Sequence, residues 1–564
     1  MPVHVPIGIE DFRKIRESGL EYVDKSHLIR ELLDMPGAEV VLIPRPRRFG
    51  KSLNLSMLRC FFEKREEDLA RLFEGLSIWG AGGEVRAHFQ RYPVLYLTLK
   101  GSKHDTFEAC WASLREKIAD LFVEHREALE SARLDEVERG RVRQILDGTA
   151  GRELYDRALF DLSRYLHRAH GEKVVILIDE YDEPIHAGHA GGYERPILDF
   201  FRAFFTEGLK GNPHVFKAVL TGILRIARES IFSGLNNVAV FSLLRPELST
   251  CFGFTEAEVQ SLLEKAGRAD RIEDVRLWYN GYLFGDTVVY NPWSVVNFVA
   301  DARAEARPYW VSTSSNDLIK RELTRRAVRL EPVFEELLGG GGVERVIDES
   351  TVLEELDRND DALFSLLVFS GYLKASRRAR GPAEQAVHYL TIPNREVRLV
   401  YQSTFREWLA SSLHAQGGSV DRLVRSVLGG DALGFEEELQ VLATSLLSYH
   451  DGGVRAEQLY QGFLVGLLAV MEPDYRVRSN RESGKGRPDV LITPVKAGAP
   501  GVVMELKVAR AGRKTLEQAL EEGVAQIESG DYEAELRAAG AATVRAFAVA
   551  FDGKQVRVRA AKEG

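Results

Sequence analysis

The sequence has few of the residues that stabilise secreted or membrane-embedded proteins. Cysteine occurs only three times in 564 residues, at Cys60, Cys110 and Cys251, with no CxxC pair. A disulfide framework and a zinc knuckle are therefore not expected, and this usage fits a reducing cytoplasm. The N-terminus lacks the basic and apolar regions of a signal peptide, and no run of about 18 apolar residues occurs. We expect a soluble cytoplasmic protein with no membrane partner.

Basic residues are outnumbered by acidic residues. The chain has 84 acidic and 75 basic residues, which gives a net charge of −9. A general basic coat for nucleic acid is thereby excluded, so any such binding needs a local basic patch. The apolar content of 45% and charged content of 28% are ordinary for globular proteins. At roughly 150 residues per domain, the length indicates three or four folding units.

The pattern of apolar runs divides the chain into three predicted regions, 1–245, 246–430 and 431–564. In the first region, nearly continuous apolar runs alternate with amphipathic stretches, which is typical of a parallel α/β sheet covered by helices on both faces. The runs are Val40–Ile43, Pro93–Leu99, Val174–Ile178, Phe216–Leu220 and Val238–Leu243. The second region is predicted to be helical with aromatic turns, and the third returns to mixed α/β structure.

A strand, a turn and a helix follow one another around Phe49-Gly50-Lys51-Ser52. In a phosphate-binding loop, amides at the helix N-terminus bind the anion, the lysine reaches the outer phosphates and the serine ligates Mg²⁺. The full pattern GxxxxGK[ST] requires glycine at position 45, where this chain has Arg45. Taken alone, the turn is also compatible with a chance Gly-Lys-Ser. The predicted nucleotide-binding residues of the loop are Arg48, Phe49, Gly50, Lys51, Ser52 and Leu53.

The second half of the predicted nucleotide site follows a later apolar strand. Asp179 and Glu180 end that strand, where an aspartate joins the Mg²⁺ shell and a glutamate polarises the attacking water. A solvated acidic loop is the alternative, but the position two strands after the Gly-Lys-Ser turn favours a site for ATP or GTP. Thr221 ends the next strand and is predicted to sense the γ-phosphate. Arg225 is a candidate for stabilising transition-state charge, although a solvated helix face is the competing interpretation.

The C-terminal region carries a second set of charged residues on two predicted strands. Asp489 is on the first strand, and Glu505 and Lys507 alternate onto one face of the second. A hairpin register that brings Asp489 beside them would create a Mg²⁺ site for hydrolysis, with Lys507 orienting the nucleophile or stabilising charge. Glu457, on the preceding helix, is a further candidate metal ligand. A charged hairpin edge is the simpler alternative.

Two neighbouring features fit the same prediction. Gln526 is on the helix that follows the second strand. A local basic cluster precedes Asp489, and it is either a guide for phosphates or a solvated loop. Its members are Arg476, Arg478, Arg481, Lys485 and Arg487.

These residues occur within longer motifs that resemble known families. The N-terminal part resembles the AAA-ATPase-like proteins, in which the phosphate loop reads RPRRFGKSL and the first glycine is usually missing. The C-terminal part resembles the PD-(D/E)XK nuclease domain commonly fused to them. The matching segments are Arg45–Leu53, Leu177–Ile185, Ser230–Val238, Trp278–Gly285, Tyr290–Val295, Tyr309–Asp317, Ile392–Arg398, Pro488-Asp489 and Glu505-Leu506-Lys507. The resemblance implies an additional-strand P-loop ATPase, a helical middle region and a restriction-endonuclease-like α/β domain.

The leading hypothesis is an ATPase coupled to Mg²⁺-dependent cleavage of nucleic acid, with Mn²⁺ as an alternative ion at the nuclease site. DNA is favoured over RNA, and the pairing of domains suggests defence against foreign DNA. The alternative is a nucleotide-dependent switch or scaffold whose nuclease fold only binds nucleic acid or a protein partner. A DNA-translocating motor is a third hypothesis, for which Arg225 is the candidate arginine between protomers of a homo-oligomer.

Overall fold

A computed structural model describes most of the chain, and its contacts divide it into two compact units. Unit 1 comprises residues 1–314 and 344–397, and unit 2 comprises residues 315–343 and 398–564. The described residues are 3–223, 237–310, 319, 322–323, 325–338, 340–349, 356, 359–377, 387–403, 417–446, 456–468, 471, 474–479, 488–509, 514–530 and 532–563. The predicted middle region, 246–430, is divided between the two units.

The centre of unit 1 is a parallel sheet that, in the described residues, has five strands in the order β2-β3-β4-β1-β5. The predicted parallel α/β fold is therefore confirmed. Strand β4 lies between β1 and β3, so one strand separates the phosphate-loop strand from the strand that ends in Asp179. The strands are β1 (Val40–Pro44), β2 (Val94–Thr98), β3 (Val174–Asp179), β4 (Val215–Gly222) and β5 (Val238–Val240).

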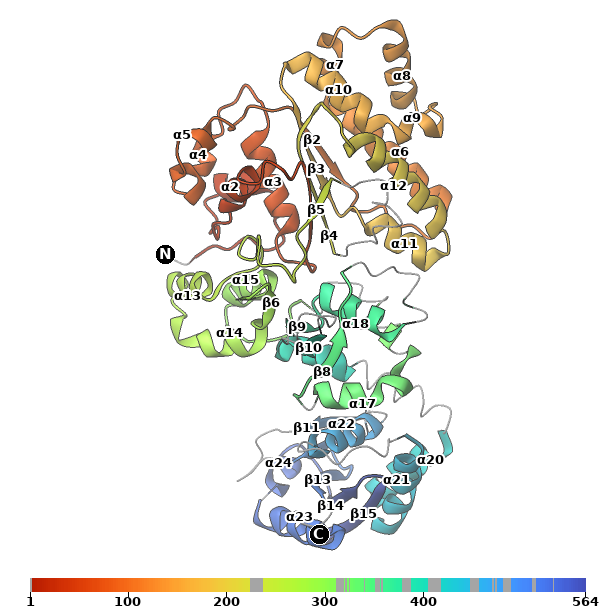
Figure 1. Ribbon diagram of the computed structural model, residues 1–564. Coiled ribbons are helices and arrows are strands. Elements are labelled where there is room, and N and C mark those ends of the chain that lie inside the picture. The colour runs from red at the N-terminus through yellow and green to blue at the C-terminus, as the bar shows by residue number, and fades with distance from the viewer. Residues whose placement is uncertain are drawn as a thin grey trace. The chain divides into compact units, whose positions relative to one another are not determined.

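Helices cover both faces of this sheet. Strands β1 and β3 are buried along their whole length, which explains their unbroken apolar sequences. Figure 1 shows α2 and α3 on one side of the sheet and α10 and α12 on the other. The helices before β4 are α1 (Phe12–Glu17), α2 (His27–Leu33), α3 (Lys51–Phe62), α4 (Ala70–Phe73), η1 (Ser77–Gly80), α5 (Gly83–Arg86), α6 (Phe107–Glu124), α7 (Arg126–Ser131), α8 (Glu136–Leu146), α9 (Arg152–Asp156), α10 (Ala158–His170), α11 (Glu183–Gly191) and α12 (Glu194–Leu209).

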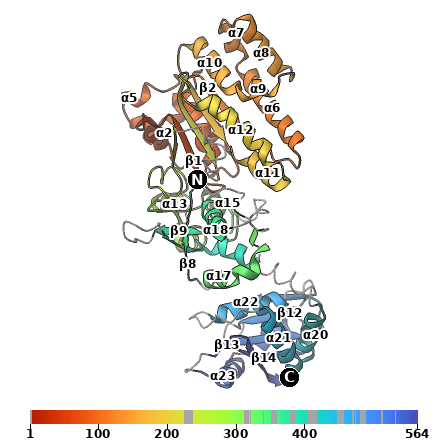
Figure 2. The ribbon, with the colours of Figure 1, turned by 45° about the vertical axis from the view of Figure 1, so that its right-hand side comes forward.

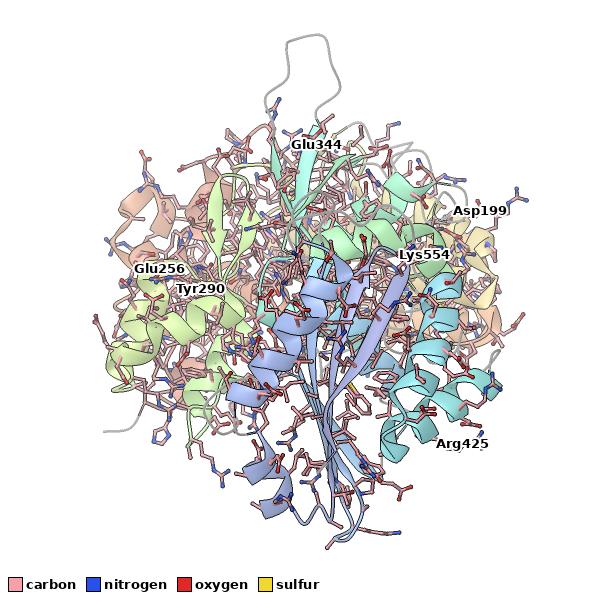
Figure 3. All side chains as sticks on the ribbon, turned by 90° about the horizontal axis from the view of Figure 1, so that it is seen from below. Asp199, Glu256, Tyr290, Glu344, Arg425 and Lys554 are labelled. Atoms are coloured by element: carbon pink, nitrogen blue, oxygen red, sulfur yellow. The ribbon has the colours of Figure 1, made fainter. Side chains whose placement is uncertain are left out.

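The remainder of unit 1 is built from short helices and hairpins. Tyr290 donates a hydrogen bond to Glu256 at the start of α13, and Figure 3 shows the two residues beside each other. Asn291 caps α15 by accepting from the amide of Ser294 at 3.3 Å, and Pro292 occupies the first helical position. The elements are α13 (Glu256–Lys265), η2 (Ala269–Arg271), α14 (Ile272–Tyr279), β6 (Tyr282–Phe284), β7 (Thr287–Val289), α15 (Pro292–Ala300), β8 (Val343–Val346), α18 (Asp360–Phe369), β9 (Lys374–Arg377) and β10 (Val387–Thr391).

Unit 2 contains a mixed sheet with the order β11-β12-β13-β14-β15 in its described part. Strands β13 and β14 are parallel and the other neighbours are antiparallel. One face packs on α20, α21 and α22, and the opposite face packs on α23 and α24. Figure 2 labels α20 to α23 around the strands, and Figure 1 labels α24. The elements are α17 (Ala327–Leu338), α20 (Gly417–Gly429), α21 (Ala432–Leu446), α22 (Ala456–Leu468), β11 (Tyr475–Ser479), β12 (Val490–Pro494), β13 (Gly501–Val508), α23 (Leu516–Ser529), α24 (Glu533–Ala538), β14 (Val544–Asp552) and β15 (Gln555–Glu563).

The predicted C-terminal α/β fold is likewise confirmed, including the helix before the strand pair and the helix after it. In the part of the chain that the structure describes, no helix combines the length and the apolar character needed to cross a membrane.

Candidate functional site

The phosphate loop connects the end of β1 to the start of α3. Gly50 precedes the helix with φ +84°, a left-handed conformation that favours glycine. Lys51 begins α3 and is 6% exposed, and its ammonium donates to the carbonyl oxygens of Arg45 and Pro46, both at 3.1 Å. Burial lowers the pKa of Lys51, while the nearby carboxylates of Glu180 and Asp179 oppose that shift. The loop therefore holds its cation at the helix N-terminus, where an anion binds most favourably.

Asp179 connects the loop with the tips of two neighbouring strands. One oxygen accepts from Ser52 Oγ at 2.5 Å, and the other accepts from Thr221 Oγ1 at 2.7 Å. The amide of Glu180 also donates to the second oxygen at 3.0 Å. Burial raises the pKa of Asp179, whereas the two hydroxyl hydrogen bonds lower it. The structure thus brings together Lys51, Ser52, Asp179 and Thr221 at one edge of the sheet.

The acidic segment after β3 is folded into the protein and is not a solvated loop. Asp182 is 2% exposed and accepts from the amide of Ile223 at 2.8 Å. Glu183 accepts from the amide of Gly101 at 2.8 Å, and burial followed by the neighbouring Glu180 raises its pKa to about 8. Glu180 itself is half-buried with φ +50°, an uncommon backbone conformation for a residue with a side chain. These contacts fix the position of Glu180 beside the phosphate loop.

Arg45 replaces the glycine of the standard motif, and its side chain is completely buried. The guanidinium donates to the carbonyl oxygens of Pro44 at 2.9 Å, Phe241 at 2.7 Å and Leu248 at 3.3 Å. It also lies over the ring of Phe284 at 5.0 Å. Burial lowers the pKa of Arg45 to about 10. The first position of this loop is therefore an anchor that ties β1 to the segment following β5.

The remaining loop residues differ in what their side chains contact. Phe49 is buried against Tyr282 and Phe284, at ring-centroid distances of 4.9 and 5.2 Å, so only its backbone faces the loop. Arg48 lies over the ring of Trp293 at 4.4 Å. Leu53 is half-buried on α3. Among the residues predicted to contact the nucleotide, Phe49 therefore has a side chain that packs in the core.

Several sequence motifs of unit 1 converge behind the phosphate loop. The buried carboxylate of Glu396 accepts from Ser294 Oγ at 2.8 Å and from the amide of Trp310 at 2.5 Å. The indole of Trp310 in turn donates to the carbonyl oxygen of Arg47 at 3.3 Å. Gly281 has φ +92°, and a Cβ there would lie 2.1 Å from the carbonyl oxygen of Pro393. Aromatic motifs far apart in sequence thus support the loop from one side.

These residues fit a bound nucleotide and Mg²⁺. Ser52 and Asp179 already present a hydroxyl and a carboxylate oxygen within 2.5 Å of each other, and oxygen donors are what Mg²⁺ prefers. Lys51 and the amides at the start of α3 supply the positive potential that phosphates require.

In unit 2, the strand register brings the second set of charged residues together. Val490 pairs with Met504 across the antiparallel strands β12 and β13, and continuing this register by one residue places Asp489 opposite Glu505. Asp489 Oδ2 also accepts from the amide of Leu506 at 2.8 Å. Lys507 Nζ lies 3.5 Å from Glu505 Oε2. Asp489, Glu505 and Lys507 consequently share one face of the sheet; alternation predicted this for Glu505 and Lys507, and the antiparallel register adds Asp489.

Glu505 is the most constrained of these side chains. It is completely buried, and within the described residues neither carboxylate oxygen has a donor at hydrogen-bonding geometry. Burial, followed by the nearby charge of Asp489, raises its pKa to about 8, while Lys507 and Tyr532 oppose the shift. A buried carboxylate without hydrogen-bond donors beside a second carboxylate is strongly disfavoured unless positive charge compensates it, and the Lys507 ammonium 3.5 Å away supplies part of that charge.

The helix-covered face around Glu505 leaves room for the lysine. Glu505 and Lys507 pair with Ala548 and Ala550 on the parallel strand β14. On α23, a Cβ at Gly523 would lie 3.0 Å from Ala548 Cβ and 3.6 Å from Lys507 Cγ. Small residues therefore surround the stem of Lys507. The buried Glu505 and the facing Asp489 fit a divalent cation bound by two carboxylates, with the Lys507 ammonium beside them.

Some predicted residues lie wholly or partly outside the description. Arg225 is not among the described residues, and neither is most of Ser230–Val238. Glu457 belongs to α22, but its side chain is not described. Of the basic cluster, Arg476 and Arg478 are described and exposed on β11, and the pairing of Arg478 with Leu491 puts them on the face of the sheet that carries Glu505. The remaining members, Arg481, Lys485 and Arg487, are outside the description.

Sequence reasoning missed two residues near the carboxylates and one near Glu180. Gln461 Nε2 on α22 donates to the carbonyl oxygen of Asp489 at 2.7 Å. The hydroxyl of Tyr532 faces Glu505 and Gln526, and burial raises its pKa to about 12. The third is Glu183, which follows Glu180 in the acidic segment and contacts it. Only Gln461 had a sequence signal, since it is one helical turn after Glu457.

Comparisons with known proteins agree with this geometry. A family model described as "Predicted AAA-ATPase" matches residues 6–232, and one described as "PD-(D/E)XK nuclease superfamily" matches residues 455–561. Among curated proteins, an "Uncharacterized protein in vnfD 5'region" from Azotobacter chroococcum mcd 1 is 31% identical over 401 residues. That match covers 70% of this chain and 68% of that protein. The ATPase-like match contains the phosphate loop, Asp179 and Thr221, and the nuclease match contains Asp489, Glu505 and Lys507.

Proposed function

Because this chain belongs to the predicted AAA-ATPases that carry a C-terminal PD-(D/E)XK nuclease superfamily domain, we propose that it hydrolyses ATP in unit 1 and cleaves nucleic acid in unit 2. The observation that carries the nuclease half is the burial of Glu505, without hydrogen-bond donors to its oxygens in the described residues, opposite Asp489 and beside Lys507. The hydroxyl hydrogen bonds that Ser52 and Thr221 donate to Asp179 support the ATPase half.

In unit 1, Lys51 and the helix amides bind the phosphates, and Ser52 with Asp179 would hold Mg²⁺. Glu180 orients the attacking water and accepts its proton, a role supported by its fixed backbone and its contact with Glu183. Thr221 connects the γ-phosphate end of the site to Asp179. Hydrolysis would change the charge at the sheet edge where the phosphate loop and Thr221 lie, at the ends of the paired strands β1 and β4.

In unit 2, Asp489 and Glu505 would hold the divalent cation, which when bound supplies Lewis acidity and lowers the pKa of a bound water. Lys507 contributes positive charge next to the scissile phosphate. Arg476 and Arg478 lie exposed on the same face and would contact neighbouring phosphates. The proposal has four further parts. The substrate is DNA, the ion is Mg²⁺ or Mn²⁺, ATP controls cleavage, and the protein acts in defence against foreign DNA.

The test is cleavage of plasmid DNA, single-stranded DNA and RNA with Mg²⁺ or Mn²⁺, with and without ATP. Wild type is compared with Lys507→Ala and with Lys496→Ala, a matched change at an exposed lysine of the β12–β13 loop. We expect cleavage to disappear in Lys507→Ala and to persist in Lys496→Ala. ATP dependence of the wild-type rate would demonstrate coupling. ATP hydrolysis without cleavage of any substrate would favour the nucleotide-dependent switch or scaffold.

A further inference from the structure

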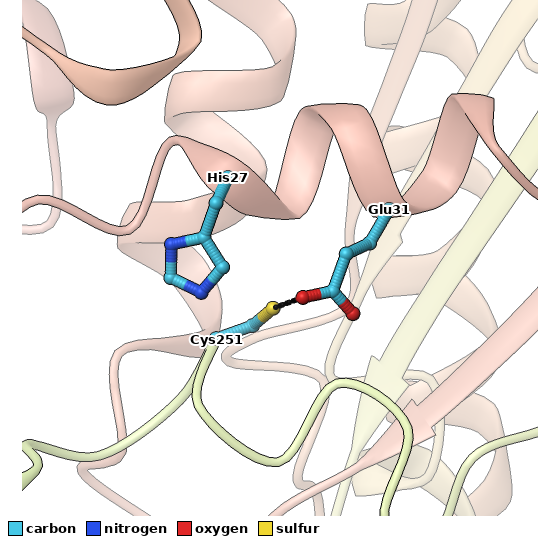
Figure 4. A group of neighbouring side chains, drawn as sticks. All are labelled: His27, Glu31 and Cys251. Carbon is cyan, nitrogen blue, oxygen red and sulfur yellow. Dashed lines mark hydrogen bonds between the residues drawn. The ribbon is translucent and has the colours of Figure 1, made fainter. Parts of the chain in front are cut away.

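A cysteine, a histidine and a glutamate converge in unit 1, outside both sites described above. His27 and Glu31 are four residues apart on α2, which puts them on one face of the helix. Cys251 comes from the segment after β5, and its Sγ lies 3.5 Å from Glu31 Oε1. One ligand atom from each of these side chains lies within 4.8 Å of the others (Figure 4). We propose that they form a binding site for a divalent cation of the zinc class.

The sulfur, nitrogen and oxygen atoms of these three side chains favour zinc and similar ions. Zinc accepts sulfur at about 2.3 Å and nitrogen or oxygen at about 2.0–2.2 Å, so tetrahedral ligands lie about 3.5 Å apart. The distance between Cys251 Sγ and Glu31 Oε1 already has this value. A thiolate and an imidazole disfavour Mg²⁺ and Ca²⁺, which prefer oxygen. His27 and Glu31 are half-buried, so solvent reaches both side chains and would supply the fourth ligand.

Burial, followed by the neighbouring carboxylate of Glu31, raises the pKa of the Cys251 thiol, so a thiolate forms here only when a cation takes the place of its proton. Cys251 is completely buried, and its thiol donates to Glu31. On coordination the cation replaces the thiol proton, which leaves to solvent, and the two anionic ligands then balance the two positive charges. Lys25 lies nearby but is paired with Glu258 at 2.7 Å, so its charge is largely compensated. Thr250 Oγ1, 3.2 Å from His27 Nε2, supplies a further oxygen beside the site.

A cation here would brace the phosphate loop. Asn54, on the helix that begins with Lys51, donates to the carbonyl oxygen of Cys251 at 2.9 Å. The amide of Gly253 donates to the carbonyl oxygen of Phe49 at 3.4 Å. A metal bound to Cys251 would thus join α2 to the segment that contacts Phe49 in the loop and Asn54 on α3. Its role is structural, and it is distinct from the proposed Mg²⁺ bound with nucleotide.

Cobalt titration of the full, metal-stripped chain tests the site. Co²⁺ occupies zinc sites, and a thiolate ligand gives a sulfur-to-cobalt absorption band in the near ultraviolet that oxygen ligands do not give. We expect this band to saturate at one Co²⁺ per chain in the wild type. It should be lost in Cys251→Ser and require at least roughly tenfold more Co²⁺ in His27→Gln. The carboxylate sites at Asp179 and Asp489 would not contribute, so the result is independent of the proposed function.

The matched control is the double variant Cys60→Ser, Cys110→Ser, which removes the other buried thiols and should keep the band. His27→Gln retains every cysteine, and circular dichroism establishes that it is folded. Absence of the band from wild type, its persistence in Cys251→Ser, or unchanged affinity in His27→Gln would each overturn the proposal.

Discussion

The two carboxylate sites of this chain differ in how their buried acids are satisfied. Asp179 in unit 1 accepts hydrogen bonds from Ser52, Thr221 and the amide of Glu180. Glu505 in unit 2 is equally buried, but its oxygens lack such donors within the described residues. The first acid is held by the protein itself, and the second depends on a cation or a proton. If the proposed functions hold, this difference means that the nucleotide site is preformed and that the stability of the nuclease site is coupled to metal binding.

The largest expected effect is loss of cleavage in Asp489→Asn. The amide oxygen still accepts from Leu506, so the hairpin is kept while one anionic ligand is lost. We expect cleavage to fall about 1,000-fold, because the charge that positions the cation is missing. Assays of plasmid cleavage and ATP hydrolysis on the same preparation measure this. Asp552→Asn, an exposed change on the same sheet, is the control. Parallel loss of ATPase activity would contradict the separation of the two sites.

Lys51→Ala should reduce ATP hydrolysis by roughly 100- to 1,000-fold, because the phosphates lose their buried cation. Steady-state phosphate release gives the rate, with the exposed Lys210→Ala as the matched variant. Cleavage measured without ATP should be unchanged. If Lys51→Ala hydrolysed ATP normally, the phosphate loop would not be the site of turnover.

Arg45→Gly restores the standard phosphate-loop glycine, yet we expect it to destabilise unit 1 by about 2–5 kcal/mol, because a large buried side chain is removed and buried carbonyl oxygens lose a donor. The carbonyl oxygens of Phe241 and Leu248 would lose their donor in a buried place. Thermal or urea unfolding measures the change. Arg47→Gly, an exposed substitution in the same loop, should cost far less. Equal stability of the two variants would show that Arg45 is not an anchor.

The pH dependence of stability should separate the two acids. The folded-state pKa of Glu505 is about 8, above its unfolded value near 4.5. The contribution of Glu505 to stability is therefore fully present below about pH 4.5 and is lost as pH rises through 8. Glu505→Gln should flatten this decline and make unit 2 more stable than wild type at pH 8 without metal. Melting curves from pH 5 to 8 test this, with Glu528→Gln on α23 as control.

Added Mg²⁺ should also distinguish wild type from Glu505→Gln at pH 8. It should raise the melting temperature of wild-type unit 2 at pH 8 and have much less effect on Glu505→Gln. An identical Mg²⁺ response in both proteins would mean that Glu505 does not bind the ion.

The smallest effect is expected from Thr221→Val, which removes one of several donors to Asp179. A single hydrogen bond contributes about 0.5–1.5 kcal/mol, so ATP hydrolysis should fall about 3- to 10-fold. Thr98→Val, at the end of β2 on the other side of β3, is the matched change. A loss as large as that of Lys51→Ala would assign Thr221 a direct role at the phosphate.

The sequence predicted those parts of the fold that depend on local pattern. Unbroken apolar runs identified β1 and β3 because both faces of these strands are covered, and alternation placed Glu505 and Lys507 on one face. Burial of Arg45 had no local signal, since its carbonyl partners come from residues about 200 positions away. Tyr532 was missed for the same reason: a tyrosine after a helix acquires meaning only when folding places it against Glu505. The roles of the individual site residues remain predictions.

The hydrogen bond between Asp489 and the amide of Leu506 also has a consequence for how the domain folds. Side chains alternate along β13, so a slip of one residue would exchange Glu505 for Leu506 on the α23 face. Such a slip would bury two charges in the apolar layer and leave Asp489 without its amide partner. Misregistered hairpins are therefore penalised by the same residues that would bind the ion. A chain that completes folding has, by that fact, already assembled its pair of facing carboxylates.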